Sequence, residues 1–135
     1  MLRVMLDTNI LVSMAFYPAP TVSRFFGVLH ADHKAVLCEY VIDEFRRIAQ
    51  QKFHVHDSVI ETFLHKFPYE FVATSQPDGS LALPKILDEN DAPILATAIL
   101  EDVDILVTGD KDFLVLDLPK PKIMTMAEFI EAFAS

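Results

Sequence analysis

Four carboxylates in this 135-residue chain lie at the ends of predicted strands or on the apolar faces of predicted helices, a placement that suits metal-ion chemistry. Asp110 closely follows an apolar run at 105–107, and Asp7 directly follows a second, nearly continuous run at 2–6. Runs this short are typical of strands buried on both faces of a parallel sheet. Open α/β sheets bind ligands at the carboxyl ends of their strands, so both carboxylates are expected at that end of the sheet. The simpler interpretation of Asp110 is that it only caps the following helix.

The other two carboxylates, Glu44 and Asp91, are predicted on helices. Glu44 comes three residues after Val41 and four before Ile48, so it projects from the apolar stripe of its helix. A carboxylate in that position is costly unless it is paired or coordinates a metal. Asp91 starts a helix on the face that Ile94 turns to the core. Two simpler interpretations stay open: Glu44 reaches solvent at the edge of the stripe, and Asp91 is only a dipole-favoured cap.

Clustering would give these carboxylates a specific chemistry, because clustered carboxylates repel one another and raise one another's pKa values. A divalent cation relieves that repulsion, and a set of oxygen donors selects Mg²⁺ or Mn²⁺ over zinc. Beside a phosphate, such a site suggests metal-assisted hydrolysis of a phosphodiester bond. The segment from Asp88 to Asp117 holds nine acidic residues and one basic residue. It therefore forms the acidic pole that a hard-cation site needs, although part of it serves as solvated surface.

The remaining sequence predicts the elements that bring these residues together. Apolar runs predict strands at 2–6, 34–38, 69–73, 104–107 and 122–124, the third of them at a sheet edge. Helices are predicted after the first strand, with Thr8 or Asn9 as N-cap, and at 21–29, 40–53, 58–66, 91–101 and 125–133. Residues 75–85 are rich in turn formers and predict a loop, not a domain boundary. Because strands and helices alternate, we expect a parallel sheet with helices on both faces.

Length and composition predict one domain, covering residues 1–135, with a full hydrophobic core. Hydrophobic residues make up 52% of the chain and the mean hydropathy is +0.31. There is no apolar run of about 18 residues, so no membrane span is expected, and no signal peptide is recognised at the N-terminus. The single cysteine, Cys38, excludes an internal disulfide and fits a reducing cytoplasm. It lies in an apolar run, which favours a packing role.

The net charge of −9 argues against binding nucleic acid through a broad basic face. Affinity for phosphate must then come from a bound cation and a few local basic residues. Lys111 is one candidate because it adjoins Asp110 in the sequence. Arg47 is the other, since it lies three residues after Glu44 and shares its side of the predicted helix.

Other families with an acidic pocket fit less well. A phospho-receiver domain needs paired acids after its first strand, where this chain has Asp7 alone, and an acceptor aspartate after a middle strand, where it has Ala73-Thr74-Ser75. A haloacid-dehalogenase-like phosphatase needs Asp-x-Asp, but position 9 is asparagine. A nucleotide-binding module is disfavoured because the chain has only three glycines and no glycine-rich phosphate loop.

The chain resembles the PIN domain, a family of metal-dependent nucleases, over its whole length. Four motifs carry the resemblance, in the family's order and at family-like spacing: Leu6-Asp7-Thr8-Asn9, Glu44, Asp91 within NDAPILATA, and Val107-Thr108-Gly109-Asp110-Lys111-Asp112-Phe113. Each motif alone is weak, whereas the ordered set is fairly specific. Within the family, the chain is similar to the branch of toxin components of prokaryotic toxin–antitoxin pairs.

The resemblance implies a three-layer α/β/α sandwich with a five-stranded parallel sheet, and a cytoplasmic ribonuclease acting on single-stranded RNA with Mg²⁺ or Mn²⁺. Its acidic set would be Asp7, Glu44, Asp91 and Asp110, with Asp112 as a fifth metal ligand. Thr8, Asn9 and Thr108 would support these carboxylates, and an antitoxin protein would be the partner. A PIN-like module that binds nucleic acid or protein without hydrolysis stays open as the alternative.

A homodimer is also expected. Ile10-Leu11-Val12 and the phenylalanine-rich stretch at 22–29 offer more apolar surface than one small sheet face needs. PIN-like proteins often pair, which strengthens the expectation.

Overall fold

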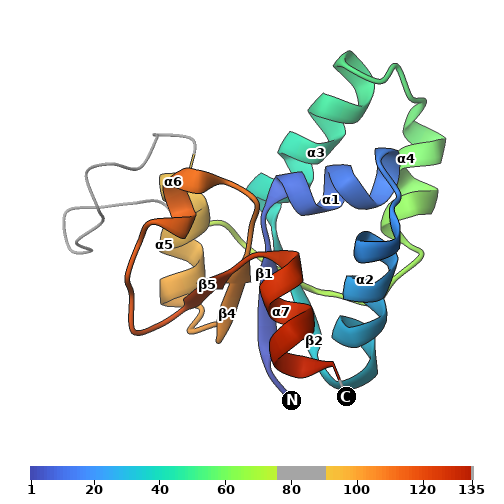
Figure 1. The fold of residues 1–135 in the computed structure, drawn as a ribbon. Helices are drawn as coiled ribbons and strands as arrows, with labels where there is room; N and C mark the ends of the chain where they lie inside the picture. The colour runs from blue at the N-terminus through green and yellow to red at the C-terminus, as the bar shows by residue number, and fades with distance from the viewer. Residues whose placement is uncertain (76–90, 135) are drawn as a thin grey trace.

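The structure, a computed structural model, describes residues 1–75 and 91–134 (Figure 1). Its sheet consists of β1 (Arg3–Leu6), β2 (Lys34–Cys38), β3 (Glu70–Val72), β4 (Ile105–Val107) and β5 (Lys122–Met124). The helices are α1 (Thr8–Phe16), α2 (Pro20–Asp32), α3 (Glu39–Gln51), α4 (Asp57–Leu64), α5 (Ala92–Leu100), α6 (Lys111–Leu114) and α7 (Met126–Phe133). Most of the loop predicted at 75–85, and the acidic residues Asp88 and Glu89, lie outside the described residues.

All five strands are parallel and follow the order β3-β2-β1-β4-β5. The central strand β1 is covered on both faces, and Val4, Met5 and Leu6 are fully buried. From β1 the chain adds β2 and β3 on one side, then returns to add β4 and β5 on the other. The strand order therefore reverses between β1 and β4, the position where open α/β sheets bind their ligands.

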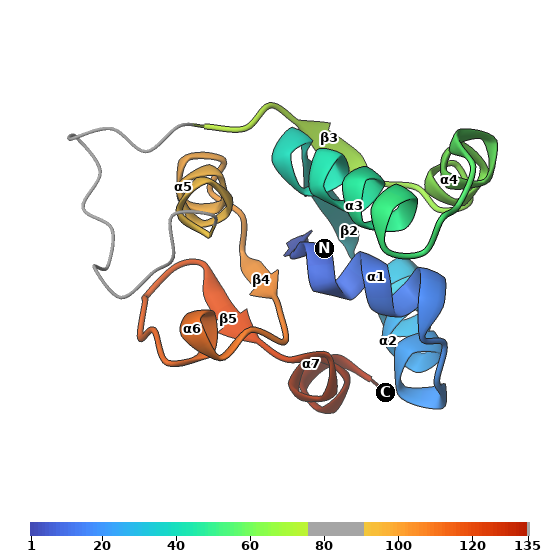
Figure 2. The same cartoon turned by 90° about the horizontal axis from the view of Figure 1, so that it is seen from above.

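Helices cover both faces of the sheet, which confirms the three-layer α/β/α prediction. In Figure 2, α5 lies on one side of the sheet, whereas α1, α2 and α7 lie on the other. The phenylalanine-rich stretch of α2 packs into the core, with Phe25 and Leu29 fully enclosed. Helix α7 begins at a capping box in which Thr125 and Glu128 exchange side-chain-to-backbone hydrogen bonds.

The predicted helix starts differ from the structure by one or two residues. The N-cap of α1 is Asp7 itself, not Thr8 or Asn9, because the Asp7 side chain accepts the first free amide of the helix. Helix α4 begins at Asp57, one residue before its predicted start, and His56 occupies the N-cap position. The strands at 34–38 and 122–124 have the predicted bounds.

Two further expectations can be compared with the burial of individual side chains, and a third with the lengths of the helices. Cys38 is fully buried, and burial raises the pKa of its thiol, in agreement with a packing role. Ile10 and Leu11 are 2% and 0% exposed, so they belong to the monomer's own core. They supply no surface for the expected homodimer, which stays a prediction. Among the described residues, no helix is long and apolar enough to cross a membrane.

Candidate metal centre

Asp7 is held at the carboxyl end of β1 by hydrogen bonds to both of its carboxylate oxygens. The backbone N–H of Thr8 donates to Oδ1 over 2.6 Å, and the hydroxyl of Thr108 donates to Oδ2 over 2.6 Å. The hydrogen bond from Thr108 to Asp7 joins residues 101 positions apart in the sequence. It follows from the β1–β4 register, which aligns Leu6 with Val107. The result is a carboxylate fixed in one orientation and only 4% exposed.

The pKa of Asp7 is raised above its ordinary value, chiefly because burial disfavours the charged form. The hydrogen bonds from Thr108 and Thr8 lower the pKa but do not offset the burial. The negative charges of Glu44 and Asp110 raise it further, so both carboxylates act on Asp7 from the same neighbourhood. A cation placed among these groups would relieve both the repulsion and the cost of the buried charge.

Asp110 both caps a helix and belongs to a carboxylate group. Its Oδ1 accepts the backbone N–H of Asp112 over 2.9 Å, which starts the short helix α6. Its own N–H donates to the Thr108 hydroxyl over 3.0 Å, so that hydroxyl bridges Asp110 and Asp7. Asp91, Asp110 and Asp112 each offer one carboxylate oxygen, and these oxygens lie within 4.8 Å of one another. The simple capping interpretation of Asp110 is thus correct but incomplete.

Asp91 occupies the N-cap position of α5 without making a side-chain capping hydrogen bond. Its backbone has helical dihedral angles, φ −90° and ψ −24°, unlike the extended backbone at Asp7 and Asp110. Pro93 falls in the first turn, where its missing N–H removes no helical hydrogen bond. The half-buried Asp91 carboxylate therefore joins Asp110 and Asp112 instead of closing the helix end.

Glu44 lies on α3 and is half-buried, with 22% of its side chain exposed. Its Oε2 atom lies 3.7 Å from Nη2 of Arg47, one helical turn further along. It is not in the close group of Asp91, Asp110 and Asp112, but its charge raises the pKa of Asp7. Asp7 is therefore influenced from two sides. Glu44 acts on it by its charge, and the close group of Asp91, Asp110 and Asp112 acts on it through Asp110.

The other predicted site residues differ from one another in burial and in hydrogen bonding. Thr8 is 2% exposed, and its hydroxyl makes no hydrogen bond within the described part of the chain. Asn9 and Lys111 are both exposed, the latter at the start of α6 beside Asp110. Sequence reasoning missed that Arg47 pairs with Glu44, because a spacing of three residues on a helix fits a phosphate contact equally well.

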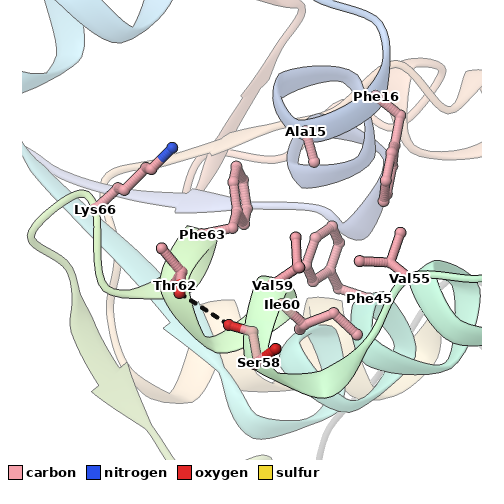
Figure 3. Close-up of a pocket in the computed structure, with 10 residues that line it drawn as sticks. All are labelled: Ala15, Phe16, Phe45, Val55, Ser58, Val59, Ile60, Thr62, Phe63 and Lys66. Atoms are coloured by element: carbon pink, nitrogen blue, oxygen red, sulfur yellow. Dashed lines mark hydrogen bonds between the residues drawn. The ribbon is translucent and has the colours of Figure 1, made fainter.

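An apolar cavity of about 380 Å³ lies apart from these carboxylates. Figure 3 shows its lining by Ala15 and Phe16 of α1, Phe45 of α3, and Val59 and Phe63 of α4. None of the acidic residues discussed above lines it. Among the described residues, the carboxylates close enough to share a cation are instead those of Asp91, Asp110 and Asp112.

The chain belongs to the PIN domain family, whose family model matches residues 3–112. The matched range includes every carboxylate of the predicted set, from Asp7 to Asp112. Among solved structures, the chain is similar to one described as the crystal structure of VapBC2 from Rickettsia felis bound to a DNA fragment from their promoter. The TM-score is 0.64 and the sequence identity 20%, with 91% of this chain and 98% of that chain covered. This likeness is one of fold. No match was found among curated proteins.

Proposed function

We propose that this PIN-domain protein is a Mg²⁺- or Mn²⁺-dependent endoribonuclease that hydrolyses phosphodiester bonds of single-stranded RNA. One observation carries the proposal: oxygens of Asp91, Asp110 and Asp112 converge within 4.8 Å. They converge beside a buried Asp7 whose pKa is raised, at the point where the strand order reverses. Membership of the PIN family supports the same chemistry.

The donor set fits a hard divalent cation, because every member offers carboxylate oxygen and none offers sulfur or imidazole nitrogen. Asp91, Asp110 and Asp112 would hold the cation, and Asp7 and Glu44 would complete its surroundings. When bound, the cation would lower the pKa of a water and neutralise charge on the scissile phosphate. Mg²⁺ and Mn²⁺ both suit such a set, since both prefer oxygen ligands.

The chain's own side chains would orient the reacting groups. Asp7 is held by hydrogen bonds from Thr8 and Thr108, so its carboxylate would face a cation without losing further side-chain rotamer freedom. The Thr108 hydroxyl also fixes the backbone of Asp110, and both carboxylates therefore keep one relative geometry. Lys111, exposed beside Asp110, would contact a phosphate of the RNA and so compensate locally for the net charge of −9.

The same proposal makes the protein the toxin of a cytoplasmic toxin–antitoxin pair, acting as one domain over residues 1–135. The similar solved structure is described as VapBC2 bound to promoter DNA, which motivates an antitoxin protein as the partner. A small adjacent reading frame with a DNA-binding pattern would support this assignment. Neighbouring genes without such a frame would count against it.

The test is cleavage of a mixed-sequence single-stranded RNA by wild-type protein with Mn²⁺, with Mg²⁺ and with EDTA. Asp110→Asn removes one central carboxylate, and Asp117→Asn serves as the matched control, because Asp117 is exposed and lies outside the carboxylate group. We expect metal-dependent cleavage by wild type and Asp117→Asn, and a loss of at least a hundredfold in Asp110→Asn. Cleavage that survives EDTA, or that Asp110→Asn retains, would overturn the proposal. Metal-dependent RNA binding without any cleavage would establish the non-hydrolytic module instead.

A further inference from the structure

Arg47 lies against one of the two predicted metal ligands outside the close group of Asp91, Asp110 and Asp112. Both of these outlying carboxylates have other partners. Asp7 accepts hydrogen bonds from Thr8 and Thr108, whereas Glu44 is paired with Arg47 at 3.7 Å. The partners differ in kind: the donors to Asp7 are neutral and buried, but Arg47 carries a full positive charge on a side chain that is 59% exposed.

We infer that, in the metal-free protein, Arg47 holds Glu44 in an ion pair that competes with a divalent cation for this carboxylate. The inference rests on the proposed function, because it requires the cation site at the sheet edge. By pairing with Glu44, Arg47 lowers the affinity of the site for a cation. Arg47 is a positioning residue, because it acts on the cation only through Glu44. Glu44 and Arg47 lie within one turn of α3, since they are three positions apart in the sequence.

The ion pair is well suited to exchange with a cation. Exposed pairs on one helix are weak and screened by salt, so a doubly charged ion at the same carboxylate can displace the guanidinium. The two positive charges also repel each other, which disfavours simultaneous contact with Glu44. Once displaced, Arg47 stays on the solvent side of α3, where its planar guanidinium can pair with a phosphate of RNA.

Arg46 provides a matched control for the charge itself. It is the same residue type at the adjacent position of α3, but its guanidinium pairs with Glu61 of α4 and not with a predicted metal ligand. Replacing either arginine by glutamine removes one positive charge from the same helix. Only Arg47→Gln releases Glu44, so a difference between the two variants isolates the proposed competition from a general change in charge.

The experiment measures Mn²⁺ binding to the metal-free full chain without RNA, by the electron paramagnetic resonance signal of free Mn²⁺. We expect Arg47→Gln to bind Mn²⁺ about two- to fivefold more tightly than wild type, the range set by an exposed ion pair. Arg46→Gln should stay within about twofold of wild type, because the carboxylate that it releases, Glu61, is not a predicted metal ligand. Combined with Glu44→Gln, Arg47→Gln should have no further effect, since the carboxylate through which it acts is gone.

Three results would overturn the inference. If Arg47→Gln and Arg46→Gln behave alike, the effect is one of charge and not of competition for Glu44. If Arg47→Gln still tightens binding in the Glu44→Gln background, Arg47 acts by another route. Both outcomes leave the proposed function standing, because wild type binds Mn²⁺ in each. Absence of Mn²⁺ binding by wild type would instead remove the cation site, and the inference with it.

Discussion

Replacing Asp7 with asparagine removes a buried charge while keeping the local hydrogen bonds nearly intact. The asparagine oxygen can accept the Thr8 amide as Oδ1 does now, and asparagine caps helices as well as aspartate. Its amide nitrogen would face the Thr108 hydroxyl, which can accept a hydrogen bond once its own proton turns away. Asp7→Asn therefore approximates the protonated form of Asp7 in shape and hydrogen bonding.

The raised pKa of Asp7 decides whether ionisation of this carboxyl raises or lowers the free energy of unfolding. The folded protein binds the Asp7 proton more tightly than the unfolded chain does, so ionisation lowers the free energy of unfolding. This loss is fully present above the folded pKa, and it disappears as the pH falls to 3.8, the ordinary pKa of an aspartate side chain. Each pKa unit corresponds to about 1.4 kcal/mol, and about 1 kcal/mol moves Tm by roughly 4 °C in a chain of this size.

The assay is thermal unfolding by circular dichroism in EDTA between pH 4 and pH 8. At pH 7, Asp7→Asn should melt at the same temperature as wild type or higher, and the gap should close towards pH 4. Asp117→Asn, which removes an exposed charge, should follow wild type throughout. A neutral-pH Tm for Asp7→Asn more than about 5 °C below wild type would refute the reasoning, because the ionised carboxylate would then be a structural support.

Three other predictions follow from the same contacts. Thr108→Val removes the hydroxyl shared by Asp7 and Asp110 and should lower the free energy of unfolding by about 1–3 kcal/mol in urea titrations, whereas Thr108→Ser should retain it; equal losses in both would contradict the bridging role. RNA binding to the wild-type protein, followed by fluorescence anisotropy with a cleavage-resistant 2′-O-methyl single strand, should gain from Mn²⁺ and give a log–log salt slope of about −1 to −3; a steep slope without a metal effect would indicate an unrecognised basic surface. Static light scattering at micromolar concentration should give a homodimer, and a monomer would rule that expectation out.

Much of the fold could be predicted because its signals are local. The strands at 34–38 and 122–124 are short apolar runs with clear polar boundaries, and α2 has an apolar stripe at helical spacing. Strand order is not a local property. Periodicity predicts a parallel sheet, but only the structure places β4 beside β1, where the order reverses. That pairing brings Thr108 to Asp7, a contact no spacing rule predicts because 101 residues separate them.

In the candidate site, too, the sequence predicts one part and only the structure shows the rest. Asp7 and Asp110 follow strands, so their shared edge follows from the fold class alone. The choice of partner for each polar group depends on side-chain geometry, which the sequence leaves open. Arg47 pairs with Glu44, which spacing did not reveal, and its predicted contact with phosphate stays a prediction. Ile10 and Leu11 were predicted as surplus apolar surface, yet α1 turns both into the core.

The location of the cation itself is the decisive quantity, and anomalous diffraction from crystals soaked in Mn²⁺ measures it. We predict an anomalous peak at the sheet edge, coordinated by carboxylate oxygens of Asp91, Asp110 and Asp112, with Asp7 and Glu44 adjacent. The same soak of Asp110→Asn crystals should weaken or abolish the peak. A fully occupied Mn²⁺ elsewhere on the protein, with none at these carboxylates, would contradict the proposed metal centre and the hydrolysis assigned to it.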